Sequence, residues 1–478
     1  MIGESAVATS VGTSRVVDTI IKNCRIVNYD YTFNGSIMII DGKVSGLAGD
    51  GLDLPDAGRI IDAKGRHVIP GVIDPHVHLA QTEDVLRSET RSAAYGGITT
   101  MLPIWSSPSF KESFEQDRNL IEQNSVIDVG LSLNITAEAG ERQVGEIGDY
   151  ARNFGITSIK FQPVYRGKEA GIFGFTGPDA GLVFQGFRNI SSVTAEGYPG
   201  LAMIHAENAE IIAKFWDEVL RQGKSGLVAW TDARPGFAEE EAMRSAIFLA
   251  SVAKTSLYIV HMTGCDGGSG VDYLAREKAE GTCVAVETCP HYLTLTKDDP
   301  DLGNRGKVNP PLRDKDAIQK LWWGIREGVV DTIGSDHAPN PLKAKQGGDI
   351  WSALPGFAGM ETLLPILLSE GVNKERITLQ KLVEVCSYNT AKVFGLYPRK
   401  GAIIPGADAD LAIIDLKKRE KVKGESLHSC AGWTPYEGRE LTGWPVLTMV
   451  RGNVVIEDGE VIAKRPIGKY IPRQRRQP

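Results

Sequence analysis

The sequence has 478 residues, of which 42% are hydrophobic and 24% are charged, and its formal net charge is −7. This composition is typical of a water-soluble globular protein with room for one large domain and a smaller one. The mild acidity argues against nucleic acid or an anionic membrane as a partner. No apolar run approaches the roughly 20 residues that cross a bilayer.

The N-terminal residues 1–14 are small and polar, so we expect them to be disordered and to contain no secretory signal. Elsewhere the chain contains six cysteines, none of them in a Cys-x-x-Cys pair and most of them in apolar segments. We interpret these cysteines as reduced, mostly buried thiols of a cytoplasmic protein.

Both ends of the chain contain β patterns with an Asp-Gly turn, at Asp41-Gly42 and at Asp458-Gly459. Since isolated hairpins are marginal in water, we expect residues 15–67 and 396–465 to pair into one small β-sandwich domain. Two separate hairpins packed on a core remain the alternative. The basic tail, residues 466–478, either wraps a neighbouring subunit or is solvated.

Residues 68–395 alternate short apolar runs with amphipathic helical patterns, which is typical of parallel βα units. The helical patterns include residues 238–253 and 317–328. Eight such strands predict an α/β fold, a (β/α)₈ TIM barrel, whose chemistry lies at the C-terminal strand ends. The predicted strands are residues 68–78, 99–103, 126–133, 158–161, 201–205, 257–261, 283–288 and 331–336.

The residues at these strand ends are unusually rich in metal-ligating groups. Successive side chains of a strand alternate faces, so His76 and His78 can reach one ion from the same side. Taken alone, His-x-His fits a metal site and a hydrogen-bonded core pair equally well. Four histidines and an aspartate at strand ends favour a metal site, because imidazole and carboxylate bind zinc and similar ions. The strand-end residues are His76, His78, Lys160, His205, His261 and Asp336.

Lys160 allows two interpretations. A lysine in an apolar strand is costly unless it is paired or neutralised. One interpretation is a salt bridge to a barrel acid such as Glu207. The other is a carboxylated amine, an anionic group that can bridge two metal ions.

These residues resemble the metal sites of the amidohydrolase superfamily, and within it the hydantoinases, dihydropyrimidinases, allantoinases and dihydroorotases. Characteristic phrases extend along nearly the whole chain, including residues 68–78, 94–100, 287–293, 309–313 and 334–339. The resemblance implies a metal-bearing barrel, here residues 68–395, beside a β-sandwich built from both chain ends. It also implies a homotetramer or homodimer.

The resemblance further implies two divalent metal ions, most simply Zn²⁺, that share a bridging hydroxide. His76, His78 and Asp336 would bind one ion, His205 and His261 the other, and carboxylated Lys160 both. Two metals lower the pKa of the shared water and polarise the amide carbonyl. Asp336 would accept the proton of the attacking water and pass it to the leaving nitrogen. His337 is expected to play a supporting role.

The substrate is expected to be a small cyclic amide. Dihydroorotases follow His-x-His with an arginine for the substrate carboxylate, whereas this chain has Leu79-Ala-Gln81, and it has Asn340 where they have a histidine. A buried carboxylate without a cation is unfavourable, which argues against dihydroorotate. Tyr165, five residues after the lysine, matches the hydantoinase tyrosine that donates to the developing oxyanion.

The resemblance therefore favours ring opening of a hydantoin- or dihydropyrimidine-type substrate to an N-carbamoyl acid. Further substrate contacts are expected at Asn309 and Thr288, and the loop holding Trp105 and Phe110 either sets specificity or only packs. His291 and Asn309 are nearer to the allantoinase or dihydroorotase pattern, so allantoinase is the first alternative. A catalytically inactive dihydropyrimidinase-like scaffold is another, but all six ligand positions are filled.

Overall fold

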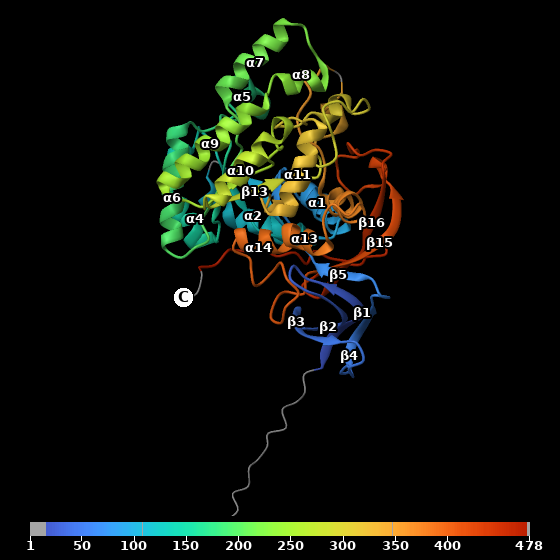
Figure 1. Cartoon of the computed structure of the whole chain (residues 1–478). Coiled ribbons are helices and arrows are strands. Elements are labelled where there is room, and N and C mark those ends of the chain that lie inside the picture. Colours follow the sequence, from blue (N-terminus) through green and yellow to red (C-terminus); the bar gives the residue numbers. More distant parts are fainter. Residues whose placement is uncertain (1–15, 108, 347, 476–478) are drawn as a thin grey trace, which may run out of the picture.

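The computed structural model describes residues 16–107, 109–346 and 348–475, so the expectation of disorder for residues 1–14 lies outside the described residues. Figure 1 shows a helix-covered barrel and, beside it, a β-rich part in which the blue N-terminal strands lie close to the red C-terminal ones. The fold expected from the sequence, a parallel barrel with a β-rich domain made from both chain ends, is confirmed.

The barrel sheet runs in the order β14-β13-β12-β11-β10-β9-β7-β6, with β8 added against β7, and all of its pairs are parallel. These strands are short and almost wholly buried, as expected where helices cover the outer face. Their bounds are β6 (Val72–Val77), β7 (Ile98–Trp105), β8 (Asp128–Val129), β9 (Ser132–Ile135), β10 (Ser158–Phe161), β11 (Leu201–Ile204), β12 (Leu257–Ile259), β13 (Val284–Thr288) and β14 (Thr332–Ile333).

The helices follow the strands, and the two helical patterns singled out above form α9 and α11. Helix α11 shows how local sequence sets the ends: the Asp314 carboxylate accepts the Ala317 N–H, and Gly328 stops the helix in the left-handed region (φ 79°). The helices are α1 (Glu83–Tyr95), α2 (Phe110–Asn124), α3 (Gly140–Gly145), α4 (Ile147–Phe154), α5 (Lys168–Phe173), α6 (Ala180–Ala195), α7 (Ala209–Arg221), α8 (Gly226–Asp232), α9 (Gly236–Ala253), α10 (Ser269–Ala279), α11 (Lys315–Glu327), α12 (Met360–Ile366), α13 (Leu379–Val383) and α14 (Asn389–Val393).

Contacts beyond the strand ends join β6 to β14 and so close the barrel. The Ser335 N–H donates to the Asp74 carboxylate over 3.0 Å, and the His78 N–H donates to the His337 carbonyl over 2.7 Å. A parallel bridge also pairs Val77 with His337. The two strands that carry His76, His78 and Asp336 are therefore held together directly at the end where those side chains lie.

The single strand expected over residues 68–78 is wrong, because it is two strands that meet at Gly71. β5 (His67–Pro70) pairs with strands of the β-rich domain, whereas β6 pairs with β7 in the barrel. The chain turns from one sheet to the other where a Cβ on residue 71 would lie only 2.1 Å from the Thr99 hydroxyl. Only glycine permits so close a backbone approach.

The strand expected over residues 126–133 is likewise divided, into β8 and β9, by the C-terminal tail. Tyr470 forms a bridge with Val129, and Arg473 lies beneath the intervening Gly130. The Arg473 guanidinium is buried and donates to the Ser158 hydroxyl over 2.8 Å. Tyr470, Ile471 and Arg473 of the tail are therefore buried against the barrel of their own chain, whereas Lys469, Gln474 and Arg475 are exposed.

The β-rich domain is one continuous hydrogen-bonded sheet in the order β18-β17-β16-β15-β5-β1-β2-β3, with β4 against β1. Both Asp-Gly turns occur as anticipated, between β2 and β3 and between β17 and β18. A separate cluster of buried aliphatic side chains forms its core. Its strands are β1 (Val17–Val27), β2 (Thr32–Ile40), β3 (Lys43–Gly49), β4 (Ala57–Asp62), β15 (Leu411–Lys421), β16 (Glu440–Val450), β17 (Asn453–Glu457) and β18 (Glu460–Val461).

Two general expectations can be compared with the described residues. All six cysteines are free, and four of them are buried. Within the described ranges, none of the helices combines the length and apolar character needed to cross a bilayer.

Candidate metal centre and active-site cavity

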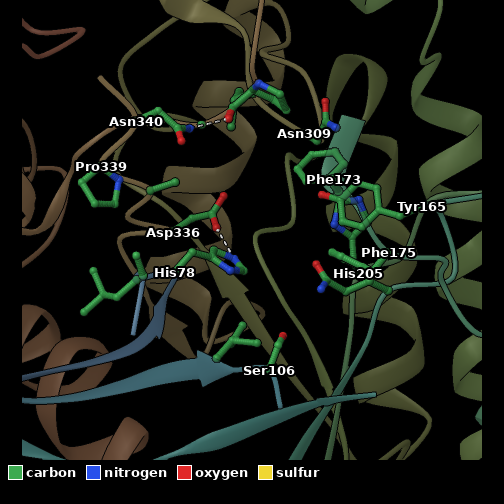
Figure 2. A pocket seen from close by; sticks show the side chains of 18 of the residues that line it. His78, Ser106, Tyr165, Phe173, Phe175, His205, Asn309, Asp336, Pro339 and Asn340 are labelled. Atoms are coloured by element: carbon green, nitrogen blue, oxygen red, sulfur yellow. Dashed lines mark hydrogen bonds and ion pairs between the residues drawn. The ribbon is translucent and has the colours of Figure 1, made fainter. Parts of the chain in front are cut away.

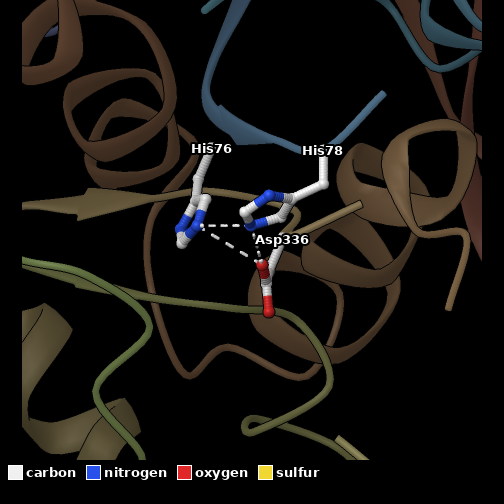
Figure 3. Close-up of side chains that lie close together, drawn as sticks. All are labelled: His76, His78 and Asp336. Atoms are coloured by element: carbon white, nitrogen blue, oxygen red, sulfur yellow. Dashed lines mark hydrogen bonds and ion pairs between the residues drawn. The ribbon is translucent and has the colours of Figure 1, made fainter. Parts of the chain in front are cut away.

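Three side chains from the two ends of the barrel sheet converge at the C-terminal mouth of the barrel. The Asp336 carboxylate lies 3.4 Å from Nε2 of His76 and 3.3 Å from Nε2 of His78, and the two imidazole nitrogens are 3.2 Å apart (Figure 3). His76 is fully buried, whereas the His78 side chain is 35% exposed. A polar cluster with one accessible member can receive a ligand from solvent.

A second group of predicted ligands lies beside the first. Nδ1 of His205 and Nε2 of His261 are 3.0 Å apart, and Nζ of Lys160 lies 3.3 Å from Nε2 of His76. The rings of His76 and His261 are stacked with centroids 5.2 Å apart, which connects the two groups. The structure thus brings all six predicted ligands together. Several nitrogen lone pairs facing one another at 3 Å suit divalent cations that favour imidazole and carboxylate ligands.

Buried carboxylates orient two of these histidines, and sequence reasoning missed this role. Oε1 of Glu287 lies 2.7 Å from Nδ1 of His76, and Oε2 of Glu207 lies 2.6 Å from Nε2 of His205. Each contact occupies one ring nitrogen and leaves the other directed at the cluster. The sequence signal was weak, since Glu287 occupies an ordinary inward position of β13.

The salt bridge considered between Lys160 and Glu207 is absent from the described residues. Glu207 instead accepts from Arg234, whose Nε is 3.0 Å from Oε1, and Arg234 also pairs with Glu169. Burial raises the Glu207 pKa, but Arg234 and His205 outweigh it and bring that pKa to about 2. Burial without such a partner lowers the pKa of the Lys160 amine to about 8. The amine is therefore far easier to neutralise than a surface lysine.

Two proposed ligands have strained backbones. His261 (φ 39°) and Asp336 (φ 50°) adopt the left-handed region, which is uncommon outside glycine. Such conformations cost on the order of 1–3 kcal/mol each and concentrate at functional sites. Asp336 also has a pKa below its ordinary value, because the neighbouring His76 and His78 imidazoles more than offset the effect of burial. It is therefore an anion at neutral pH.

A cavity of about 510 Å³ opens above this cluster. Figure 2 shows His78 and Asp336 on one side of it and Tyr165 and His205 on the other. The Tyr165 ring lies 5.2 Å from the His205 ring and packs on Phe173. Burial raises the Tyr165 pKa well above its ordinary value, so its hydroxyl stays protonated and can donate a hydrogen bond.

Of the two other predicted substrate contacts, Asn309 and Thr288, one lines the cavity and one does not. Asn309 lines the cavity and donates to Glu169 over 3.3 Å. Thr288 does not line it, because its hydroxyl is turned away to donate to the Met262 carbonyl over 2.8 Å. His337 is held by the chain, with Nδ1 accepting the Gly359 N–H over 3.0 Å and Nε2 lying 2.9 Å from Glu89.

Of the two roles considered for Trp105 and Phe110, the structure favours packing, since both are fully buried and neither lines the cavity. Phe110 instead packs against the rings of Phe114 and Tyr150. The apolar character of this segment comes from core packing at the start of α2. The residues on either side of Trp105, Ile104 and Ser106, are the ones that line the cavity.

The cavity has a polar floor and largely apolar walls. Among the described residues that line it there is no lysine and no arginine. Gln81 and Asn340, which occupy the positions compared with dihydroorotases, both line the cavity and are hydrogen-bonded to backbone carbonyls. The apolar wall residues include Leu79, Val85, Ile104, Phe173, Phe175, Val308, Pro339 and Pro341.

Comparisons with known proteins agree with this site. Two models described as the amidohydrolase family match residues 204–455 and 59–121. The chain is 35% identical over 468 residues to an L-hydantoinase of Paenarthrobacter aurescens, covering 96% of this chain and 98% of that protein. It is 31% identical over 456 residues to an allantoinase of Solibacter usitatus, with coverages of 94% and 95%.

The structure is also similar to that of an L-hydantoinase (dihydropyrimidinase) from Arthrobacter aurescens, with a TM-score of 0.86 and 34% identity over 96% of this chain and all of that one. The chain therefore belongs to the amidohydrolase family. Within that family it is a cyclic amidohydrolase of the hydantoinase and dihydropyrimidinase group.

Proposed function

We propose that this protein opens the ring of a hydantoin- or dihydropyrimidine-type substrate by hydrolysing a cyclic amide bond, giving an N-carbamoyl acid. The observation that carries the proposal is the convergence of four histidines, one aspartate and a buried lysine under a cavity whose described lining residues include no lysine and no arginine. The names of full-length relatives, which include hydantoinases, support the same activity.

The residues fit two divalent ions, which we propose to be Zn²⁺. His76, His78 and Asp336 would hold one, His205 and His261 the other, and Lys160, carboxylated on its amine, would contact both. When bound, such ions lower the pKa of a water molecule and polarise the substrate carbonyl. The depressed pKa of the buried Lys160 amine supports carboxylation, because carbon dioxide adds to the neutral amine.

Asp336 acts as the proton carrier in this mechanism. It is a carboxylate at neutral pH, it lies against His76 and His78, and it lines the substrate cavity. It accepts the proton of the attacking water and then delivers it to the ring nitrogen. This delivery is needed because an unprotonated amide nitrogen is a poor leaving group.

Tyr165 acts on the opposite side of the cavity. Its protonated hydroxyl donates to the carbonyl oxygen as negative charge develops there. Asn309, which also lines the cavity, positions the polar edge of the ring. The apolar walls accommodate an uncharged ring substituent, and the absence of lysine and arginine among the described lining residues disfavours a carboxylated ring such as dihydroorotate.

The test is a rate comparison on hydantoin, dihydrouracil, allantoin and dihydroorotate with metal-replete protein, together with metal analysis. We expect the highest kcat/KM on hydantoin or dihydrouracil and about two divalent ions per chain. If allantoin is turned over fastest, the protein is an allantoinase, the alternative that the residues at positions 291 and 309, His291 and Asn309, favour. Protein that is produced with an ample metal supply and still contains no metal and shows no activity would be a scaffold and would contradict the proposal.

We further propose that the enzyme is cytoplasmic and works as a homotetramer or homodimer. Six free thiols support a reducing compartment. Light scattering of the purified protein tests the oligomeric state.

A further inference from the structure

We propose that Glu287 is a positioning residue that fixes the ring of His76 and thereby sets the affinity for one of the two metal ions. The inference rests on the metal binding proposed above and names the residue that controls it. Glu287 lies on β13, outside the set of six predicted ligands, and does not itself line the cavity.

The first support is the set of hydrogen bonds around this fully buried carboxylate. Oε1 lies 2.7 Å from Nδ1 of His76 and accepts the His261 N–H over 2.9 Å, while Oε2 accepts the Tyr258 hydroxyl over 2.7 Å. One carboxylate therefore joins β6, β12 and β13 beneath the site. It connects a ligand of one proposed ion to the strand that carries a ligand of the other.

The contact with Nδ1 also decides which nitrogen of His76 can bind metal. A carboxylate accepts a hydrogen bond and does not donate one. Nδ1 of His76 therefore carries the hydrogen, and Nε2 of His76 carries the lone pair. Nε2 is the atom that faces His78 and Asp336. Such partners also make the ligand nitrogen more basic, and their removal typically weakens metal binding about 10–100-fold.

The second support comes from Gly334, at the end of β14. A Cβ at this position would lie 2.8 Å from Oε2 of Glu287 and 3.1 Å from Cβ of His76. Because residue 334 has no side chain, the His76–Glu287 pair can pack directly against its backbone. This explains why glycine precedes Ser335 and Asp336 in a segment where a side chain would displace the pair.

The two carboxylates behind the histidines differ in charge balance. Glu207 is neutralised by Arg234, whose guanidinium contacts both of its oxygens. In the described chain, Glu287 has no lysine or arginine within ion-pair distance, and its partners are a histidine, a tyrosine and a backbone N–H. Glu287 therefore differs from Glu207 in having no built-in cationic partner among the described residues, and it faces His76 as a hydrogen-bond acceptor.

The test is titration of metal-free protein with Zn²⁺ against a competing chelator, comparing wild type, Glu287→Gln and Glu287→Ala. Glu287→Gln keeps a hydrogen-bond acceptor but loses the carboxylate, and we expect one of the two stepwise Zn²⁺ affinities to fall about 10-fold. Glu287→Ala loses the acceptor as well, and we expect the same affinity to fall by up to about 100-fold. The other affinity stays within about threefold. If the Ala variant does not fold, the isosteric Gln variant carries the test.

The matched control is Glu361→Gln, which alters a second carboxylate–histidine pair. Oε1 of Glu361 lies 2.8 Å from Nδ1 of His428, a histidine outside the proposed ligand set. We expect both Zn²⁺ affinities to be unchanged in this control. Three outcomes would overturn the inference. They are unchanged Zn²⁺ affinities in both Glu287 variants, equal losses of affinity at both sites, and a loss in Glu361→Gln as large as that in Glu287→Gln. Failure of wild type to bind two ions would instead overturn the proposed function.

Discussion

Each end of the barrel has a cluster of three side chains whose potential ligand atoms all lie within 4.8 Å of one another. The cluster at the C-terminal end of the strands consists of His76, His78 and Asp336, and the cluster at the other end consists of Asp128, Asp408 and Asp410. Their neighbours differ, because the acidic cluster already contains cations of its own chain.

Lys400 fills the centre of the acidic cluster. Its Nζ lies 2.8 Å from Asp128 and 3.3 Å from Asp408 and also contacts Asp410, while Arg451 pairs with Asp128 from the other side. Of the described lysines and arginines, Lys160 alone contacts the histidine cluster, and burial lowers its pKa to about 8. Proximity of ligand atoms thus defines a candidate site, and the presence of built-in counter-ions decides whether it is a structural network or a place for a ligand.

The largest effect is expected from Lys160→Ala. Without the side chain that we propose to contact both ions, bound metal should fall from about two ions per chain to nearly none, with loss of activity. Metal analysis after dialysis measures this. A short carboxylate added to the variant should restore part of the activity, and a variant with full metal content and rate would contradict the bridging role.

Asp336→Asn should come next. We expect kcat to fall about 10³-fold, within the range for losing a group that transfers protons. Steady-state kinetics with the best cyclic substrate measures the change. A variant that keeps at least one ion yet turns over at the wild-type rate would exclude Asp336 as the proton carrier.

Tyr165→Phe should lower kcat about 10²-fold, the scale of losing one oxyanion donor, with a smaller change in KM. Tyr150→Phe is the control, since Tyr150 is a buried tyrosine that donates to Glu146 over 2.6 Å outside the cavity. An unchanged kcat in Tyr165→Phe would leave this residue with a packing role alone.

Lys400→Met should change stability and leave chemistry intact. It leaves three buried aspartates with one cation fewer, and breaking a buried pair costs about 3–5 kcal/mol. Chemical denaturation should show this loss, while metal content and kcat per folded molecule stay at wild-type values. Loss of metal in this variant would break the distinction between the two clusters.

The smallest effect concerns Lys345, a buried lysine whose Nζ donates to the Lys307 carbonyl over 2.8 Å. Burial holds its pKa well below the ordinary 10.5. The unfolded chain then binds a proton that the folded chain does not, so this group makes stability rise with pH up to about 10. The thermal midpoint of Lys345→Met minus that of wild type should therefore decrease by about 1–3 °C from pH 7 to pH 10. A difference independent of pH would contradict this.

The sequence predicted the barrel and the six converging side chains because each ligand follows a short apolar run, and strand ends of a parallel barrel meet at one mouth. It could not predict contacts made between distant segments. The breaks at Gly71 and Gly130 depend on Thr99 and Arg473, and the roles of Glu287 and Arg234 depend on which inward side chains face each other. For Trp105 and Phe110 the sequence left specificity and packing both open, because aromatic residues near a strand end fit a cavity wall and a core equally well.

One wall of the cavity comes from the segment between β15 and β16, which supplies Cys430 and whose Trp433 donates to the Asn340 carbonyl over 2.8 Å. During synthesis all six proposed ligands emerge from the ribosome before this segment does. β5, near the start of the chain, likewise waits for β15 to complete its pairing. The ligands of the barrel are therefore all made before the segment that supplies Cys430 to the cavity wall.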